Sequence, residues 1–135
     1  MKVNTANYYL LLVLVQAAHS IEEYFGHLWD VFPPAKWLTG LIASNRHDAF
    51  LAINFGLFIF GMFSWYFIVR KRQKFALVIV WFMVLLEISN GIMHIGWSIK
   101  QSNYAPGLIT APFLLIVAFL LAKTTYDDKV RSEVS

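Results

Sequence analysis

The stretch from Ala49 to Val69 contains no charged residue and no histidine, and it is bounded by Asp48 and Arg70. Its length matches the roughly 20 residues that a helix needs to cross ~30 Å of hydrocarbon. Only 14% of the 135 residues are charged, against about 25% in an average globular domain. A small soluble domain has a large surface for its volume and needs more charge than this to cover it. The sequence therefore predicts an integral membrane protein.

Three further apolar blocks extend this prediction to four membrane-spanning helices. The expected spans are residues 8–29, 49–69, 75–99 and 106–122, followed by a disordered cytoplasmic tail at 123–135. Pro33 and Pro34 are expected to break any helix that follows the first span. The chain has no cysteine, which excludes disulfides and thiolate metal sites. We therefore expect one all-α domain, residues 1–135, folded as a polytopic four-helix bundle.

The basic residues predict the orientation of this bundle. Four of them gather between the second and third blocks, namely Arg70, Lys71, Arg72 and Lys74. Placing that loop in the cytoplasm puts both termini there too, together with Lys2, Lys123, Lys129 and Arg131. Only three basic residues then lie outside, which are Lys36, Arg46 and Lys100. The positive-inside rule thus predicts an N-in/C-in protein.

These features also predict the location and the partners of the chain. We expect a multi-pass protein in the plasma (inner) membrane of a bacterium, in contact with membrane lipids and with a lipophilic small-molecule substrate. The net charge of +3 is explained by the basic loop, so no nucleic-acid partner is expected. Self-association into a homo-oligomer stays open.

Two of the expected spans each carry one polar stripe. The stripes are His19, Glu22 and Glu23 on the first span and Glu87, Asn90 and His94 on the third. Counted at ~1.5 Å per residue from the cytoplasmic ends, they overlap at depths of roughly 16 to 28 Å, and Asn54 of the second span falls at roughly 22 Å. Ionisable groups at such depth cost several kcal/mol and mark function. The sequence therefore predicts one site in the outer half of the membrane.

The residue types in this cluster suit a divalent metal ion. Neutral imidazole nitrogen and carboxylate oxygen are ligands for zinc, iron and manganese. The expected metal ligands are His19, Glu23, Glu87 and His94, and the expected catalytic residues are Glu22, Glu23, Asn54, Asn90 and Tyr104. One carboxylate that does not bind the metal would act as general base. Asn54 and Asn90 would orient the substrate or stabilise an oxyanion, and Tyr104 would donate a proton.

Metal-dependent hydrolysis of a lipid or another lipophilic molecule is the leading hypothesis, and three alternatives stay open. Glu22 or Glu23 could activate water without a metal. The cluster could belong to a small proton or cation transporter assembled from several copies, although the apolar cytoplasmic halves of the first and third spans disfavour a pathway. The cluster could also join the helices of the bundle, or bind a lipid headgroup or a partner helix, in a lipid-binding or scaffold protein.

Three motifs in the chain resemble those of a known family. HSIEE, from His19 to Glu23, resembles the HXXEE motif that names a family of small integral membrane proteins, NGIMH resembles its N-x-x-x-H motif, and YAPGLIT resembles its Y-x-P-G-x-x-T motif. The resemblance implies a multi-span bundle with an enzymatic or metal-binding site, and it supplies no substrate. The motif residues are His19, Glu22, Glu23, Asn90, His94, Tyr104, Pro106, Gly107 and Thr110. Glu87 and Asn54 rest on the depth argument alone.

Overall fold

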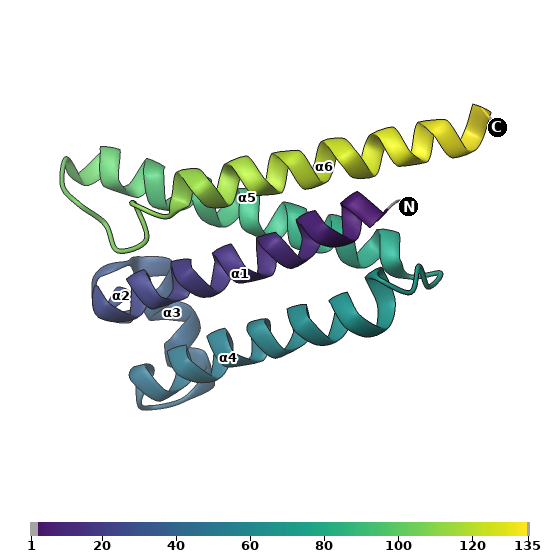
Figure 1. Ribbon diagram of the computed structural model, residues 1–135. Coiled ribbons are helices and arrows are strands. Elements are labelled where there is room, and N and C mark those ends of the chain that lie inside the picture. Colours follow the sequence, from purple (N-terminus) through teal and green to yellow (C-terminus); the bar gives the residue numbers. More distant parts are fainter. Residues whose placement is uncertain (1–2, 135) are drawn as a thin grey trace.

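A computed structural model describes the backbone of residues 3–134 and the side chains of residues 4–130. In this part of the chain every regular element is a helix. The long elements are α1 (Val3–Phe25), α4 (Arg46–Ser64) with its π-helical continuation η1 (Trp65–Val69), α5 (Ala76–Gln101) and α6 (Ala111–Val134). They lie side by side, and α2 (Leu28–Val31) and α3 (Pro33–Ile42) join α1 to α4 at one end (Figure 1). The all-α prediction is confirmed.

Two helices are long and apolar enough to cross a membrane, Arg46–Val69 and Ala76–Gln101. Only 17% of the apolar window of the first and 33% of that of the second is buried, whereas an apolar helix in a soluble protein is buried in its core. Among the described residues, α1 and α6 do not meet the same measure. α1 carries the polar stripe, and the apolar part of α6 ends at Lys123. The structure thus supports two of the four expected spans.

Several boundaries differ from the expected ones. The first span is expected to reach residue 29, but α1 ends earlier and the chain turns at His27, whose φ is 52°. Pro33 and Pro34 follow the end of α2 as expected, but they also begin α3, because the fixed φ of proline suits the first turn of a helix. The fourth long helix begins at Ala111 rather than at residue 106, since the chain forms turns over 106–110.

The expectation of a disordered tail at 123–135 is wrong for the described residues, because α6 continues as a helix to Val134. Thr5 of α1 donates a hydrogen bond of 2.9 Å to the Asp128 carboxylate, which ties this extension to α1. Lys2 and the side chain of Arg131, which were assigned to the cytoplasmic side, lie outside the described residues. Ser135 lies outside them as well.

Two apolar clusters pack the helices, one toward each end of the molecule. The larger joins α1, η1, α5 and α6 through side chains that include Tyr9, Leu12, Val69, Val80, Met83, Leu114 and Leu121. The smaller joins α2 to α4 through Leu28, Trp29, Phe32 and Phe50. Along α1 and α5 five buried polar side chains lie between these clusters, namely Gln16, His19, Glu23, Glu87 and His94, while the buried Thr5 and Ser98 lie near the helix ends. The packing therefore isolates one polar layer inside an apolar molecule.

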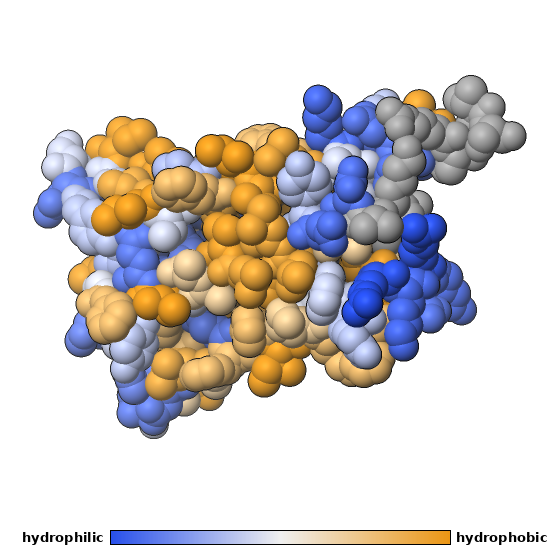
Figure 2. Space-filling model, viewed as in Figure 1, coloured by the Kyte–Doolittle hydropathy of each residue, from blue (hydrophilic) through white to orange (hydrophobic). Residues whose placement is uncertain are grey.

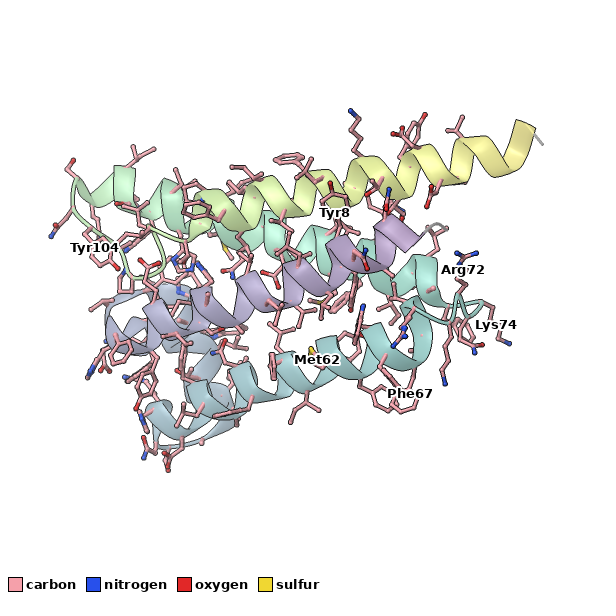
Figure 3. The ribbon with its side chains drawn as sticks, in the orientation of Figure 1. Tyr8, Met62, Phe67, Arg72, Lys74 and Tyr104 are labelled. Carbon is pink, nitrogen blue, oxygen red and sulfur yellow. The ribbon has the colours of Figure 1, made fainter. Side chains whose placement is uncertain are left out.

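The two ends of the molecule are chemically different. Arg72 and Lys74 lie at the end where both termini emerge, and Tyr104 lies at the opposite end (Figures 1 and 3). Hydrophobic residues dominate the middle of the face shown in Figure 2, and hydrophilic residues gather toward both ends. The polar layer lies closer to the Tyr104 end, because Glu22, adjacent to it, accepts a hydrogen bond from Tyr104.

Candidate metal centre

His19 and Glu23 of α1 and His94 of α5 bring three potential ligand atoms together, all within 4.8 Å of one another. All three side chains are buried. Glu23 Oε1 lies 2.9 Å from His94 Nε2 and 3.4 Å from His19 Nε2. Ligand atoms around a tetrahedral zinc ion are about 3.3 Å apart, given bonds of about 2.0–2.1 Å. This triad could hold a metal ion, as the sequence predicts for these three residues.

The hydrogen-bonding state of the triad also suits a metal ion. Both Nε2 atoms are close to the Glu23 carboxylate, yet within the described part of the chain neither makes a hydrogen bond of acceptable geometry. Buried polar atoms in proteins are almost always paired. Two imidazole nitrogens at ion-pair distance from one carboxylate oxygen form a donor set that could also bind a cation.

Thr110 determines which nitrogen of His19 carries the proton. The Thr110 hydroxyl lies 2.6 Å from Glu22 Oε2 and 2.7 Å from His19 Nδ1. An ionised carboxylate only accepts, so the single hydroxyl proton goes to Glu22, and the hydroxyl oxygen accepts from His19 Nδ1–H. A neutral imidazole with its proton on Nδ1 has its lone pair on Nε2, the atom beside Glu23. The pair of Glu22 and Thr110 thus orients His19 as outer-shell partners orient metal ligands.

The carboxylate of Glu22 connects α1 to the loop before α6. It accepts hydrogen bonds from the Tyr104 hydroxyl (2.6 Å), the Ile109 N–H (3.0 Å), the Thr110 N–H (2.9 Å) and the Thr110 hydroxyl. These four donors occupy both oxygens and hold Glu22 against the loop, while its expected catalytic role stays a prediction.

Tyr104 makes the matching contact from the loop, while its expected role in proton transfer stays a prediction. Its hydroxyl donates to Glu22, and its side chain is 47% exposed at the end of the molecule (Figure 3). Partial burial, together with the hydrogen bond to Glu22 and the negative charge of that carboxylate, raises the pKa of Tyr104 to about 12. A phenol with so high a pKa is a weak proton donor near neutral pH.

Gly107 lies directly against the two imidazole rings. Its φ is 93°, and a Cβ at this position would lie 2.7 Å from His19 Cε1 and 2.8 Å from His94 Nδ1. On the other side of the same turn, a Cβ at Gly26 would overlap the side chain of Pro106. The Pro-Gly turn therefore fills the space beside the triad so closely that neither glycine leaves room for a larger residue.

Three other predicted residues lie outside the triad. Glu87 is buried on α5, two turns before His94, and neither of its carboxylate oxygens has a hydrogen-bond partner within the described part of the chain. Asn90 is half-buried between them on the same helix. Asn54 bonds instead to Ser20 (2.6 Å) and to the Phe50 carbonyl (3.0 Å). The structure therefore does not bring Glu87 into the ligand group or Asn54 to the triad.

Two residues beside the site were not predicted. Gly26 accommodates Pro106, and the ring of Phe32 lies 5.3 Å from that of His94, between centroids. The position of Gly26 just after the HSIEE segment is a signal for a close approach of two backbones. Phe32 gives no comparable signal, because the chain contains 12 phenylalanines in similar apolar surroundings.

Residues 10–122 match the model of a family described as "Protein of unknown function with HXXEE motif". The chain belongs to this family. No curated protein and no solved structure matches it. In this HXXEE protein the first motif supplies two triad residues, His19 and Glu23, and the N-x-x-x-H motif supplies the third, His94. The first glutamate of the HSIEE motif, Glu22, binds the Y-x-P-G-x-x-T loop, so all three motifs meet at one place.

Proposed function

We propose that this HXXEE protein is a membrane-embedded, metal-dependent enzyme, most simply a hydrolase, that acts on a lipid or another lipophilic molecule. One observation carries the proposal: two buried imidazole Nε2 atoms from α1 and α5 converge at ion-pair distance on one buried carboxylate oxygen, and among the described residues neither nitrogen makes a hydrogen bond of good geometry. Two histidines and one glutamate form a ligand set of catalytic zinc sites, in which a fourth position is left for water or substrate. Iron and manganese accept the same ligands.

The exposed apolar surface supports placing all four long helices in the membrane. Each exposes large apolar side chains, among them Leu14 on α1 (48%), Phe55 on α4 (63%), Leu85 on α5 (61%) and Phe119 on α6 (58%). So much exposed apolar surface is typical of contact with lipid. With the basic loop at 70–74 in the cytoplasm, both termini lie inside and the triad lies in the outer half of the bilayer.

The proposed chemistry assigns separate roles to the buried polar side chains. A divalent metal ion, when bound, would supply Lewis-acid activation of water for hydrolysis. His19, Glu23 and His94 would hold the metal ion, and the pair of Glu22 and Thr110 orients His19. Asn90, one turn before His94 on α5, is placed to orient the substrate, whereas Glu87 lies a further turn away, outside the triad.

The large apolar cluster supports this proposal over transport. It fills the space between the triad and the Arg72 end with side chains such as Leu12, Val80, Leu114 and Leu121, each no more than 1% exposed. An ion or proton pathway to the cytoplasm would need polar groups there.

Metal analysis of the protein purified in detergent tests the proposal. We expect one zinc, iron or manganese ion per chain, lost in His19→Ala and in His94→Ala. His47→Ala is the matched control, because His47 pairs with Asp48 at the surface instead. Glu87→Gln should keep the metal, since Glu87 lies outside the triad. A folded wild-type protein that binds none of these metals after supplementation would refute the metal-dependent function.

The orientation has a separate test. The chain contains no cysteine, so single cysteines report on one position each. A cysteine replacing Arg72 should resist an impermeant thiol reagent in intact cells, and one replacing Asn103 should react. The reverse pattern would overturn the proposed N-in/C-in topology.

A further inference from the structure

A groove of about 410 Å³ lies between α1 and α4. This volume falls in the range of roughly 300 to 1,000 Å³ that is usual for small-molecule sites. Its walls are mostly apolar and include Ala17, Ile21, Phe55 and Phe58. Ile21 and Phe55 are 57% and 63% exposed, so in the proposed membrane placement the groove opens toward the lipid.

One wall of this groove carries a row of polar side chains. Gln16 Nε2 donates to Ser20 Oγ at 3.2 Å, Ser20 donates to Asn54 Oδ1 at 2.6 Å, and Asn54 Nδ2 donates to the Phe50 carbonyl at 3.0 Å. Gln16 is 5% exposed, and its Oε1 has no hydrogen-bond partner among the described residues. The row therefore ends in a buried acceptor that lacks a donor, which is uncommon in proteins.

Gln16 also connects the groove to the triad. It precedes Glu23 by two helical turns, which places the two side chains on the same face of α1, within about 20°. His19 is one turn away on the same helix. The triad residues do not line the groove, so Gln16 is the residue of the polar layer that also lines the groove.

We infer that the groove binds the hydrocarbon chain of a single-chain amphiphile whose hydroxyl or amide N–H group donates a hydrogen bond to Gln16 Oε1. The inference rests on the proposed function and specifies the substrate class for the same site. The apolar walls of the groove contact the hydrocarbon chain of the amphiphile, and Gln16 Oε1 selects its polar end. A site with an unpaired acceptor strongly disfavours an analogue that cannot donate a hydrogen bond. The amphiphile then lies with its polar end beside the metal ligands of α1.

Photolabelling of the full-length protein in detergent tests the binding itself. The probe is a long-chain alcohol that carries a diazirine in its chain. We expect label on residues 13–25 and 50–58. Ala17→Phe places a ring in the groove and should lower this labelling several-fold. Ala18→Phe is the matched control, because Ala18 is exposed outside the groove and the same substitution there should leave the labelling unchanged.

The role of the acceptor is tested with a second probe, the methyl ether of the same alcohol, which cannot donate. The wild type should label more strongly with the alcohol than with the ether. Gln16→Leu keeps the approximate volume but removes the acceptor, so it should lose this preference while its labelling by the ether is unchanged, which also shows that the groove is intact.

Three results would overturn the inference: equal labelling of Ala17→Phe and Ala18→Phe, label spread evenly over α6, or an alcohol preference that survives in Gln16→Leu. The metal content of each variant is measured in parallel. Wild-type metal with no groove labelling refutes the amphiphile site alone, whereas groove labelling of a protein that binds no metal refutes the metal-dependent function alone.

Discussion

Gly107→Ala should damage the metal centre through one added methyl group. The new Cβ would lie 2.7 Å from His19 Cε1, and 2.8 and 2.9 Å from His94 Nδ1 and Cε1. Ordinary carbon contacts are roughly 3.5–4.0 Å, so the rings or the loop must move by about 1 Å. Metal and catalytic sites tolerate displacements of only about 0.5 Å. The variant should therefore bind its metal about 10- to 100-fold more weakly, the loss typical of a disturbed outer shell.

The same substitution should also destabilise the fold. At a φ of 93° an L-residue costs roughly 1–2 kcal/mol more than glycine, and forcing extra atoms into a packed site costs about 1–3 kcal/mol. We expect a loss of about 2–5 kcal/mol in the free energy of unfolding, measured by thermal or denaturant unfolding in detergent.

Gly96→Ala is the control for this prediction. Gly96 lies on α5, two residues after His94, and a Cβ there meets nothing within 4 Å. Alanine should stabilise this helix by roughly 0.5–1 kcal/mol and leave metal affinity unchanged. If Gly107→Ala bound metal with wild-type affinity and kept wild-type stability, the close packing of the turn against the two rings would be wrong.

Three further predictions concern the loop that covers the triad. Thr110→Val removes the hydroxyl that orients His19 and should weaken metal binding about 10- to 100-fold. Thr110→Ser keeps the hydroxyl and should bind metal like the wild type. Metal affinity is measured by competition with a chelator, and equal affinities of Thr110→Val and the wild type would exclude the orienting role. Gly26→Ala overlaps Pro106 and should lower the melting temperature, while Gly56→Ala, with open space around its Cβ, should not. Folding raises the pKa of Tyr104 from 10 to about 12, so the stabilisation that Tyr104 gives the fold is complete below pH 10 and is lost as the pH rises toward 12. The difference in melting temperature between wild type and Tyr104→Phe should therefore shrink from pH 10 to pH 12. A constant difference over that range would contradict this prediction.

The triad could be predicted because its pattern is local. His19 and Glu23 are one turn apart, and parallel helices bring His94 to the face that carries them. The prediction of Glu87 as a fourth ligand failed because depth was counted from the first apolar residue, Tyr8. The helix begins at Val3 instead, which places every residue of α1 about 7 Å further along at ~1.5 Å per residue. Glu23 is then level with His94, and Glu87 is level with Gln16.

The roles of Glu22 and Tyr104 could not be separated from those of the triad by sequence. Adjacent glutamates point about 100° apart on a helix, and only the position of the covering loop shows that Glu22 faces Thr110 while Glu23 faces the histidines. The extension of α6 was missed for another reason. Its last residues are polar, and a polar helix gives no hydrophobic periodicity to detect.

The three motifs come from the first long helix, the third long helix and the loop before the fourth, so the site is assembled from distant parts of the chain. During synthesis His19 and Glu23 are made first, His94 follows much later, and Gly107 and Thr110 close the site only when the last loop is in place. Binding of a metal to residues brought together by folding adds its free energy to the folded state. Metal capture, if it occurs as proposed, would then act as a checkpoint in biogenesis, since only a chain whose last loop has folded onto the two histidines has a complete centre to load.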